Sequence, residues 1–534
     1  MNERLRAALD GYLELRCHLD PVEATSIGRH EFDGRFARYD QDSVREALAA
    51  LRAYTSELEE AAADSIEDEI DRTAALHAAR HDILVLERER PFARDPSFHL
   101  SHVLNGFLLL LTRESSQPVA RAQAVLERLR ALPEFLEAAK ERLSTPSRAS
   151  VRSAMGVLTD VHELIRYGLD DPVVDLTALE PLDLEDARVR ALDGLMTFGE
   201  VLESLDESAG DDFAIGRDLF DRKLHTAHMI RENADELMRF GERLRERAEA
   251  DLKRSAEEIA PGVHWREVAE RLRMDIPTPE TAIGEYEDAI ESAREFTITH
   301  RLLSVTPVEL RVIPTPDFLQ ALSPNAPSSA YVGAGAYAAQ QRGLLFVKLS
   351  PHKDSWHARC RAELPAVALR VGIPGQHQHV SVRNRLPQPV RRVIGTPATL
   401  EGWPLYCEQV MTEVGFLRAP EARFFAAYRS LWCALGLLLD ISLHTRGLSR
   451  EAAEATLHEQ LGIDLALAEE ETLRYCARPT YQVCGAVGGR DILLLRDDAR
   501  QAAGDAFSLA AFHDSLLSYG ALPTALARWG MGLA

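Results

Sequence analysis

A change in residue periodicity near residue 304 constrains the fold of this chain more than any other feature of its sequence. Residues 1–300 carry apolar side chains at helical spacing in one segment after another, with charged side chains on the other faces. Glu309–Pro314 and Gly343–Leu349 are instead short apolar runs bounded by Pro, Gly and Ser, which is typical of strands. Helical spacing returns from Trp356 onward. The pattern predicts a mainly α protein with a small β-sheet.

Capping residues and prolines indicate where individual helices begin. Ser43, with a Glu three residues later, matches a capping box. Pro118 and Pro133 each stand where a first helical turn would begin. The segment Ser323–Gly335, rich in Pro, Ser, Ala and Gly, is expected to be a loop between the two strands.

The expected organisation is one compact body made of two parts. Residues 1–300 form an N-terminal helical region, and residues 301–534 form a C-terminal region that contains the sheet. The segment Thr177–Asp186 contains Pro and several Asp residues, and it is the expected hinge or boundary within the first part. No fixed-period repeat indicates a solenoid.

Charge and cysteine usage bound the partners and the compartment. The 534-residue chain has a formal net charge of -23, which argues against nucleic acid and anionic membrane as partners. Its six cysteines form no Cys-x-x-Cys pair, so we expect reduced thiols rather than a disulfide framework. Residues 1–10 are charged and lack the hydrophobic core of a signal peptide. These features predict a cytoplasmic protein; the oligomeric state stays open.

The segments Arg370–His379 and Leu400–Glu408 carry the most functional information. Together with four further segments in the same order, they resemble the bacterial "domain of unknown function" family numbered 885, whose mostly helical, zincin-like members are assigned as metallopeptidases. The other four segments are Asp20–Gly28, Pro327–Val332, Asp440–Ser449 and Asp491–Arg496, with Phe512–Pro523 extending the C-terminal signature. The resemblance implies a gluzincin-type, zincin-like helical fold with the sheet beside a deep central cleft, whose floor is the Pro-Gly segment.

The same resemblance identifies departures at the metal site. The family usually reads His-Glu-x-x-Pro-Gly-His-His, and its first His, its Glu and its second His fall on Arg370, Val371 and Gln376. Zinc hydrolysis needs about three N or O ligands and a carboxylate that takes the proton of water. Arginine cannot ligate zinc, and valine has no proton-accepting atom. Of the implied ligands, His377 and Glu401 remain.

A later family motif departs as well. Its tyrosine and lysine fall on Gly485 and Ala486, so a phenol that could stabilise an oxyanion is absent at that position. A carboxylate placed to face a dication would be costly to bury without a partner. We therefore expect Arg370 to supply the missing positive charge and to pair with Glu401.

Two alternatives for the histidines stay open. A rebuilt zinc site could use His377, His379 and Glu401, with Cys407 or His357, if the Pro-Gly break distorts the backbone. On a regular helix, however, His377 and His379 face roughly opposite sides, which favours structural roles. Tyr406 is the remaining candidate for the cleft.

Other potential sites have sufficient structural explanations. The pairs His77–His81, His225–His228 and Asp440–His444 each lie on one helix face, but no carboxylate constellation accompanies the first two. Among the cysteines, Cys360, Cys407 and Cys484 fall near the former metal segments, and helical core packing is the expected role of Cys407.

The expected function is that of a degenerate zincin-like metallopeptidase homologue without zinc peptidase activity. Its cleft would bind a peptide-like or small-molecule ligand or would support an altered reaction. The alternatives are an active peptide or amide hydrolase with a rebuilt metal site, and a non-catalytic interaction protein. No cofactor is expected, with zinc as the single alternative.

Overall fold

The computed structural model describes residues 2–113, 117–171, 174–321, 329–349 and 360–533. Within these residues most of the chain is helical, and three strands form one small sheet. The mainly α fold with a small β-sheet that the periodicity predicted is confirmed. Of the predicted loop and ligands, residues 323–328 and His357 lie outside the described ranges.

The helices follow one another along the chain with short connections. The first half contains α1 (Glu3–Leu19), α2 (Pro21–Ile27), α3 (Gln41–Glu60), α4 (Ile66–Leu84), α5 (Pro91–Arg94), α6 (Pro96–Thr112), α7 (Pro118–Arg142), α8 (Arg148–Arg166), α9 (Pro181–Ser208), α10 (Arg217–His228), α11 (Ala234–Ile259), α12 (Trp265–Arg273) and α13 (Ala282–Thr299). The second half contains α14 (Asp317–Ala321), α15 (Leu364–Val371), α16 (Gln376–Arg383), α17 (Pro389–Val393), α18 (Pro397–Glu413), α19 (Pro420–Thr445), α20 (Arg450–Leu461), α21 (Leu465–Ala477), α22 (Tyr481–Ala503), α23 (Leu509–Leu517) and α24 (Thr524–Gly530). Short 3-10 or π segments are η1 (His30–Phe32), η2 (Val85–Glu89), η3 (Gly168–Asp170), η4 (Arg361–Glu363) and η5 (Gly504–Ala506).

The sheet has the strand order β1-β3-β2. Strand β1 (Glu309–Pro314) runs parallel to the central strand β3 (Arg342–Val347), and β2 (Ser329–Val332) pairs antiparallel with β3. Both predicted strands are therefore confirmed. Strand β2 falls in the segment Ser323–Gly335, which was predicted to be a loop. The strand is only four residues long and stands in a segment rich in Pro, Ser and Ala, so its sequence carries too little strand signal.

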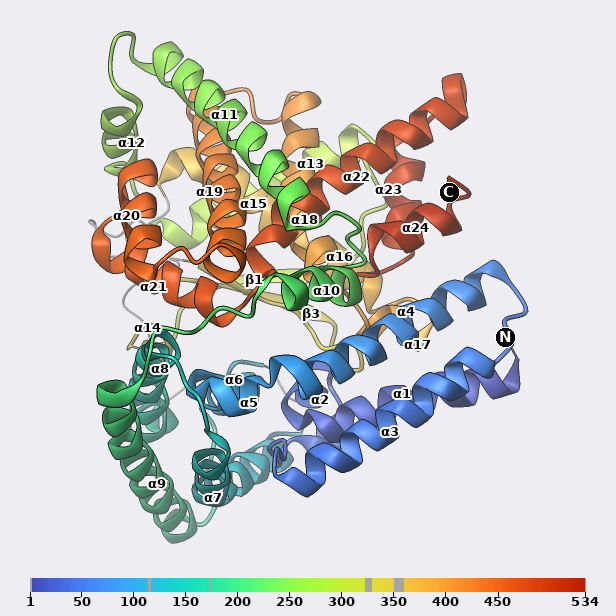
Figure 1. Cartoon of the computed structure of the whole chain (residues 1–534). Helices are drawn as coiled ribbons and strands as arrows, with labels where there is room; N and C mark the ends of the chain where they lie inside the picture. Colours follow the sequence, from blue (N-terminus) through green and yellow to red (C-terminus); the bar gives the residue numbers. More distant parts are fainter. Residues whose placement is uncertain (1, 114–116, 172–173, 322–328, 350–359, 534) are drawn as a thin grey trace.

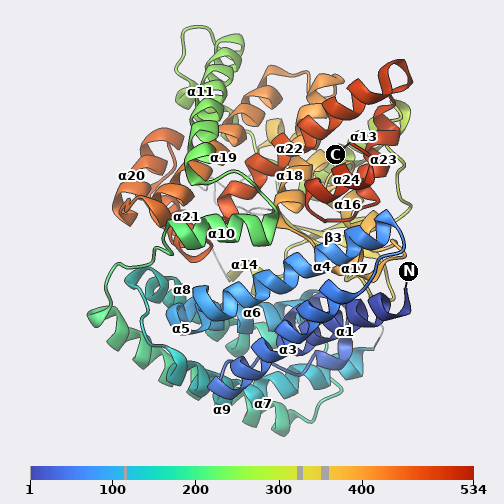
Figure 2. The ribbon, with the colours of Figure 1, turned by 45° about the vertical axis from the view of Figure 1, so that its right-hand side comes forward.

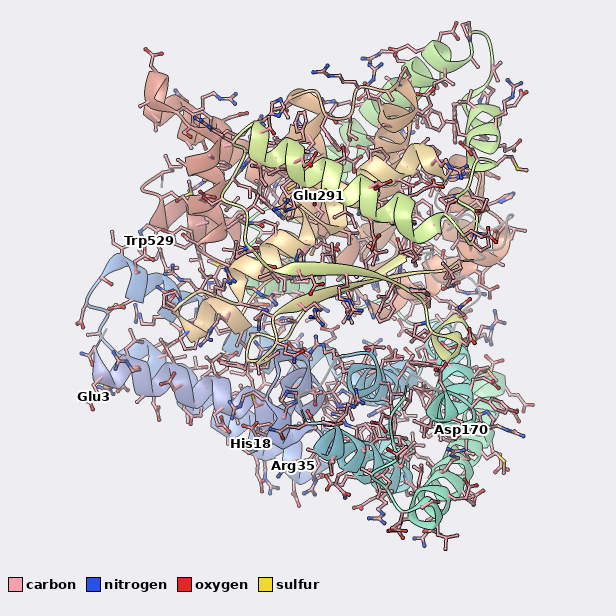
Figure 3. The ribbon with its side chains drawn as sticks, turned by 180° about the vertical axis from the view of Figure 1, so that it is seen from behind. Glu3, His18, Arg35, Asp170, Glu291 and Trp529 are labelled. Carbon is pink, nitrogen blue, oxygen red and sulfur yellow. The ribbon has the colours of Figure 1, made fainter. Side chains whose placement is uncertain are left out.

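The sheet lies between two groups of helices. Helices α1–α9 gather on one side of the molecule, and α11–α13 with α18–α24 gather on the other (Figures 1 and 2). Seen from behind, the strands cross the middle, with the helix that carries Glu291 above them and the segments that carry His18 and Asp170 below (Figure 3).

The hydrophobic core does not divide at residue 300. The largest cluster of buried side chains joins Leu5 of α1 and Ala74 of α4 to Trp403 of α18 and Phe512 of α23. A second cluster joins α11 and α12 to α19, and a third holds α6–α9 together. Burial of apolar surface thus ties the two ends of the chain to each other.

Two predicted helix boundaries were wrong. The N-cap of α3 is Asp40, whose carboxylate accepts the Ser43 N–H at 3.0 Å and the Ser43 hydroxyl at 2.6 Å. A carboxylate three residues earlier therefore takes the capping role from Ser43. Pro118 does begin α7, as predicted, but Pro133 lies inside that helix. Buried leucines on both sides of Pro133, such as Leu132 and Leu136, keep the helix continuous.

Helix α19 is both long and apolar. By length and composition it could cross a membrane, but 72% of its most apolar window is buried inside the protein. It packs against α11 and α22. Its apolar character is therefore that of a core helix.

Candidate functional site

Helices α18 and α22 approach each other so closely that their crossing point requires glycine. A Cβ atom on Gly402 would lie 2.5 Å from the backbone of Gly488, and one on Gly488 would lie 1.7 Å from the carbonyl oxygen of Ala398. The approach brings the first turn of α22 beside Glu401 in the first turns of α18. Trp403 is buried and donates its indole N–H to the Pro374 carbonyl at 2.9 Å, which fixes α18 against the Pro-Gly turn.

The carboxylate of Glu401 is paired with a phenol. Tyr481, the first residue of α22, donates its O–H to Glu401 Oε1 at 2.9 Å. Burial, together with the neighbouring Glu401 carboxylate, raises the pKa of Tyr481. Asp440 of α19 holds the start of α22 by accepting the N–H groups of Thr480 at 3.1 Å and Gln482 at 3.0 Å. Tyr481 is thus a neutral donor held at a defined position.

Tyr481 lies one helical turn before Gly485, the position where the resemblance implies a phenol. A Cβ atom on Gly485 would lie 3.8 Å from the Cβ of Glu401, so both positions of α22 face the same carboxylate. The two residues are four apart in one helix and share a face. This spacing was the signal in the sequence that could have identified Tyr481.

The charge at residue 370 belongs to a buried ionic network. Arg429 of α19 binds Glu408 of α18 with two hydrogen bonds, at 2.5 Å and 3.0 Å. Their side chains are only 12% and 7% exposed. Arg429 also lies 3.7 Å from Glu363, and Arg370 lies 4.0 Å from Glu408. The network therefore joins η4, α15, α18 and α19.

The pairing of Arg370 with Glu401 that was predicted does not occur among the ion pairs of the described residues. Glu408 follows Glu401 by seven residues, or two helical turns, on the same side of α18. Arg370 at the end of α15 lies next to Glu408, and Glu401 is left to Tyr481. Arg429 was missed, although an arginine within an otherwise apolar helix indicates a buried partner.

Cys433 lies among these charges. It is half-buried, whereas the other five cysteines, Cys17, Cys360, Cys407, Cys476 and Cys484, are buried. Burial raises the pKa of the Cys433 thiol to about 11, with the guanidinium of Arg370 opposing the shift. The thiol is thus neutral near pH 7. The predicted packing of Cys407 in the helical core is confirmed.

The histidines of α16 serve separate structural contacts. The Nε2–H of His377 donates to the Val308 carbonyl at 2.9 Å, and its Nδ1 lies 3.2 Å from the Tyr331 hydroxyl. The Nε2–H of His379 donates to the Gly520 carbonyl at 2.9 Å on another side of the helix. Burial lowers the pKa of His377, and it lowers that of His379 to about 4. Both imidazoles are therefore neutral at pH 7.

The donors proposed for a rebuilt zinc site do not converge. His377 and His379 point to different backbone carbonyls, and the Glu401 carboxylate is bound to Tyr481. Throughout the described ranges, no three His, Cys, Asp or Glu side chains are grouped to hold a metal ion. These residues do not match the three-ligand geometry of a catalytic zinc site.

Tyr406 and the histidine pairs have structural partners. Tyr406 is buried, and its hydroxyl lies 2.7 Å from Nε2 of His513. His77 and His225 pack edge to face with ring centroids 5.5 Å apart. His228 lies within hydrogen-bond distance of the hydroxyls of Thr396 and Thr480.

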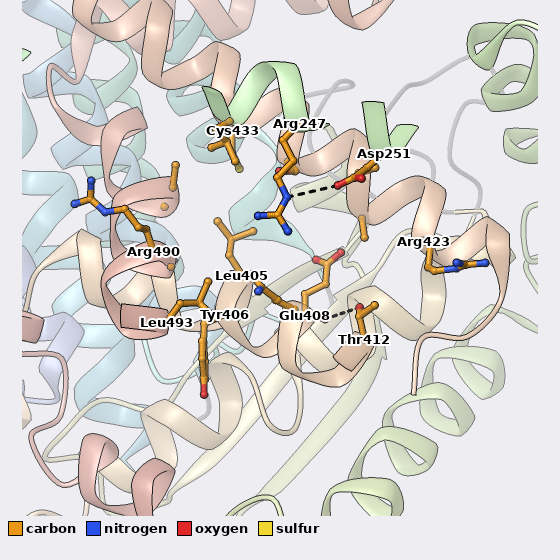
Figure 4. A pocket seen from close by; sticks show the side chains of 18 of the residues that line it. Arg247, Asp251, Leu405, Tyr406, Glu408, Thr412, Arg423, Cys433, Arg490 and Leu493 are labelled. Atoms are coloured by element: carbon orange, nitrogen blue, oxygen red, sulfur yellow. Dashed lines mark hydrogen bonds and ion pairs between the residues drawn. The ribbon is translucent and has the colours of Figure 1, made fainter. Parts of the chain in front are cut away.

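Two cavities are lined by neighbours of the Tyr481–Glu401 pair. The larger cavity, of about 810 Å³, lies between α6 and α8 on one side and α21 on the other. Arg478 lines it, and its guanidinium stands 5.7 Å from the centroid of the Tyr481 ring. The smaller cavity, of about 550 Å³, lies between α11, α18, α19 and α22 (Figure 4). Leu405 and Gly485, next to Glu401, line the smaller cavity.

The larger cavity carries opposite charges along one helix face. On α21 the lining residues include Glu469, Glu470 and Arg474, with Arg478 following the helix. Across the cavity, burial and the Glu470 carboxylate raise the pKa of Asp160 on α8 to about 7. Residues 160 and 470 are far apart in sequence, and no local pattern could have paired them.

The sequence matches the pattern of a family described as "Bacterial protein of unknown function (DUF885)" over residues 21–531. The chain belongs to this family. The predicted family is therefore confirmed. No curated protein matches the chain.

Solved structures share the whole fold. A "putative lipoprotein of unknown function" from Shewanella oneidensis superposes with a TM-score of 0.77 at 20% identity, covering 99% of each chain. A "putative lipoprotein" from Colwellia psychrerythraea superposes with a TM-score of 0.80 at 16% identity, covering 99% of this chain and 98% of its own.

The descriptions of these structures correct the predicted location. Both are described as lipoproteins, which contradicts the prediction of a cytoplasmic protein. Net charge and unpaired cysteines, two of the features behind that prediction, report the solubility and packing of a domain. They do not report the compartment in which the domain works.

Proposed function

We propose that this protein is a zincin-like family member that binds a short peptide-like ligand without a metal ion and has no zinc peptidase activity. The larger cavity is the proposed ligand site. It differs from the expected central cleft, because the Pro-Gly segment expected as the floor of that cleft is not among its lining residues. The degenerate segment around Arg370 then serves as scaffold, because Arg370 lies 4.0 Å from Glu408, which lines the smaller cavity.

The donor chemistry supports a metal-independent role. Arg370 and Val371 stand at the positions where the resemblance implies a ligand and a base. Glu401 is bound to Tyr481, and Glu408 is neutralised by Arg429. A zinc ion would have to displace these hydrogen bonds and would meet two neighbouring guanidinium groups.

The charged residues that line the larger cavity are the observation that indicates the class of ligand. Asp160 and Glu470 lie at one end, and Lys348 interacts electrostatically with Glu470. Arg478 stands at the other end, and among described residues no carboxylate pairs with it. An ammonium group suits the first end and a carboxylate suits the second. A free peptide carries both.

Helix geometry gives the length of the ligand. Glu470 and Ala477 are seven residues apart on α21, which corresponds to about 10 Å, and Arg478 lies just beyond. An extended chain spans about 3.3–3.6 Å per residue. The two charged ends therefore match a peptide of about three to four residues. A volume of about 810 Å³ is within the range of small-ligand sites.

Calorimetric titration with trialanine tests this proposal. We expect binding that is weakened, but still measurable, when the peptide is N-acetylated or C-amidated. Glu470→Gln should weaken the free peptide but not the N-acetylated one, and Arg478→Gln should act at the carboxyl end. Glu459→Gln, an exposed carboxylate of α20 outside the cavity, is the matched control.

Product analysis separates binding from hydrolysis. We expect trialanine to remain intact during prolonged incubation, with or without added zinc. Equal binding of free and doubly blocked peptides would contradict the assignment of the two ends. Zinc-dependent release of alanine that is abolished by Glu401→Gln would instead identify an active hydrolase.

A further inference from the structure

The smaller cavity has the shape of a second, separate ligand site. One face of each of α11, α18, α19 and α22 lines its volume of about 550 Å³. Among the described residues, it shares no lining residue with the larger cavity. Apolar surface predominates among its lining atoms, with polar groups concentrated on α11 and at the ends of α18 and α19.

Small residues create the room on the floor of this cavity. Gly485 and Gly489 of α22 face Leu405 of α18, and Ala426 of α19 lies across from them. A Cβ atom on Gly489 would lie 3.6 Å from α18, an ordinary van der Waals distance, so the packing of α18 against α22 does not require glycine at this position. The floor therefore offers an apolar surface to a ligand.

The charges on the floor are already neutralised within the protein. Glu408 is bound by Arg429, which does not line the cavity. At the far wall, Glu413 binds Arg496 at 2.7 Å and Arg490 binds Glu232 at 2.7 Å. These groups leave no net charge for a ligand.

The α11 rim keeps an excess positive charge. Arg254 and Arg247 share one carboxylate, Asp251, at 2.8 Å and 3.9 Å. Arg423 pairs with Glu258. Three guanidinium groups thus face two carboxylates. Of the three, Arg247 lies farthest from its carboxylate partner. Its side chain is 76% exposed, and Figure 4 shows it reaching over the cavity toward Leu405.

We propose that the smaller cavity binds a monocarboxylate with an apolar tail. The carboxylate is held by Arg247 at the rim, and the tail lies on the floor formed by Leu405, Ala426 and the α22 glycines. This arrangement covers the thiol of Cys433, which lines the same cavity and is the half-buried cysteine of the chain. The site is independent of the peptide site proposed above.

Octanoate is the probe for this site, and two measurements with the full chain report on it. Titration calorimetry measures affinity, and alkylation of Cys433 by N-ethylmaleimide, followed by mass spectrometry, reports occupancy. We expect octanoate to bind and to slow alkylation of Cys433. Octylamine, which has the same tail and the opposite charge, should do neither.

Three variants locate the binding. Arg247→Gln should weaken octanoate about tenfold, the loss expected for one charge-assisted contact. Arg243→Gln, an exposed arginine of the same helix outside the cavity, should leave the affinity unchanged. Ala426→Leu should fill the floor and abolish binding at a half-exposed helical position where leucine is readily accommodated.

N-acetylphenylalanine distinguishes two sources of the same chemistry. Binding of octanoate alone indicates an alkyl carboxylate, whereas binding of N-acetylphenylalanine alone or of both indicates that the carboxyl end of an apolar peptide is accepted. The proposal is overturned if neither compound binds or if octylamine protects Cys433 equally well. It is also overturned if octanoate binds equally well to the Arg247 and Ala426 variants.

Discussion

Removal of Arg429 should destabilise the protein far more than removal of an exposed arginine from the same helix. In Arg429→Met the side chain stays long and apolar, but Glu408 loses both hydrogen bonds, and Glu363 loses its cation at 3.7 Å. Both carboxylates are nearly inaccessible to water, with side chains 7% and 5% exposed. Burying a charge without its partner is costly, so the loss falls on the folded state.

The expected magnitude follows from the burial of the pair. Breaking a buried ion pair by removing one partner costs about 3–5 kcal/mol. Arg370, 4.0 Å from Glu408, remains and offsets part of the loss. We therefore expect the free energy of unfolding to fall by about 3 kcal/mol, the lower end of that range.

Urea denaturation at pH 7 and at pH 5 measures this loss. A buried carboxylate without a cation is costly while it is ionised, so the deficit should be larger at pH 7 than at pH 5. Glu408→Gln combined with Arg429→Met should recover part of the stability, because no buried charge is left at residue 408.

Arg423→Met is the matched control. Arg423 also lies on α19 and pairs with Glu258, but both side chains are about 40% exposed. We expect a loss of at most about 1 kcal/mol there. A loss of less than about 1 kcal/mol for Arg429→Met as well would refute the reasoning that the network is buried and interdependent.

Three further outcomes follow from the geometry. Asp160→Asn should raise the melting temperature at pH 8 but not at pH 3.5. Burial and Glu470 raise the folded-state pKa of Asp160 from its ordinary value of 3.8 to about 7, so stability is lost as pH rises between these two values. His81→Gln should make the free energy of unfolding less sensitive to acid between pH 6.5 and 3.5. Burial lowers the folded-state pKa of His81 to about 3, so in the native chain stability is lost as pH falls below the ordinary histidine value of 6.5. The slope of the free energy of unfolding against pH should drop by at most about 1.4 kcal/mol per pH unit. Gly488→Ala should cost about 3 kcal/mol or more in urea denaturation, whereas Gly489→Ala, whose Cβ would lie 3.6 Å from its neighbours, should be tolerated or gain up to about 1 kcal/mol.

The fold could be predicted where local pattern and packing agree. Glu309–Pro314 is a short apolar run that ends at a proline, as is typical of a strand, and it forms β1 with those limits. Pro133 carries the local signal of a helix start, but leucines on either side are buried in one continuous cluster, and packing prevails over that signal. Single hydrogen bonds decide which residue caps a helix. The sequence pattern alone could therefore not decide whether Asp40 or Ser43 is the N-cap of α3.

The site could be predicted only in part. The sequence identified Glu401 as the residue that needs a compensating partner, and the structure places one on it. The partner is Tyr481 and not Arg370. Glu401 and Glu408 lie two turns apart on α18, and the end of α15 places Arg370 beside Glu408. Asp160 and Glu470 approach only through tertiary packing of α8 against α21. Contacts of this kind have no local signature in a single sequence.

Zinc titration of the purified chain tests the central claim, metal independence, most directly. Calorimetry with zinc chloride at pH 7.5, after treatment with chelator, should be repeated with Glu401→Gln and with Tyr481→Phe, which removes the hydroxyl that binds Glu401. The account predicts no stoichiometric, tight zinc binding to the native chain and no change in either variant. Tight binding of one zinc ion per chain, lost in Glu401→Gln, would contradict it.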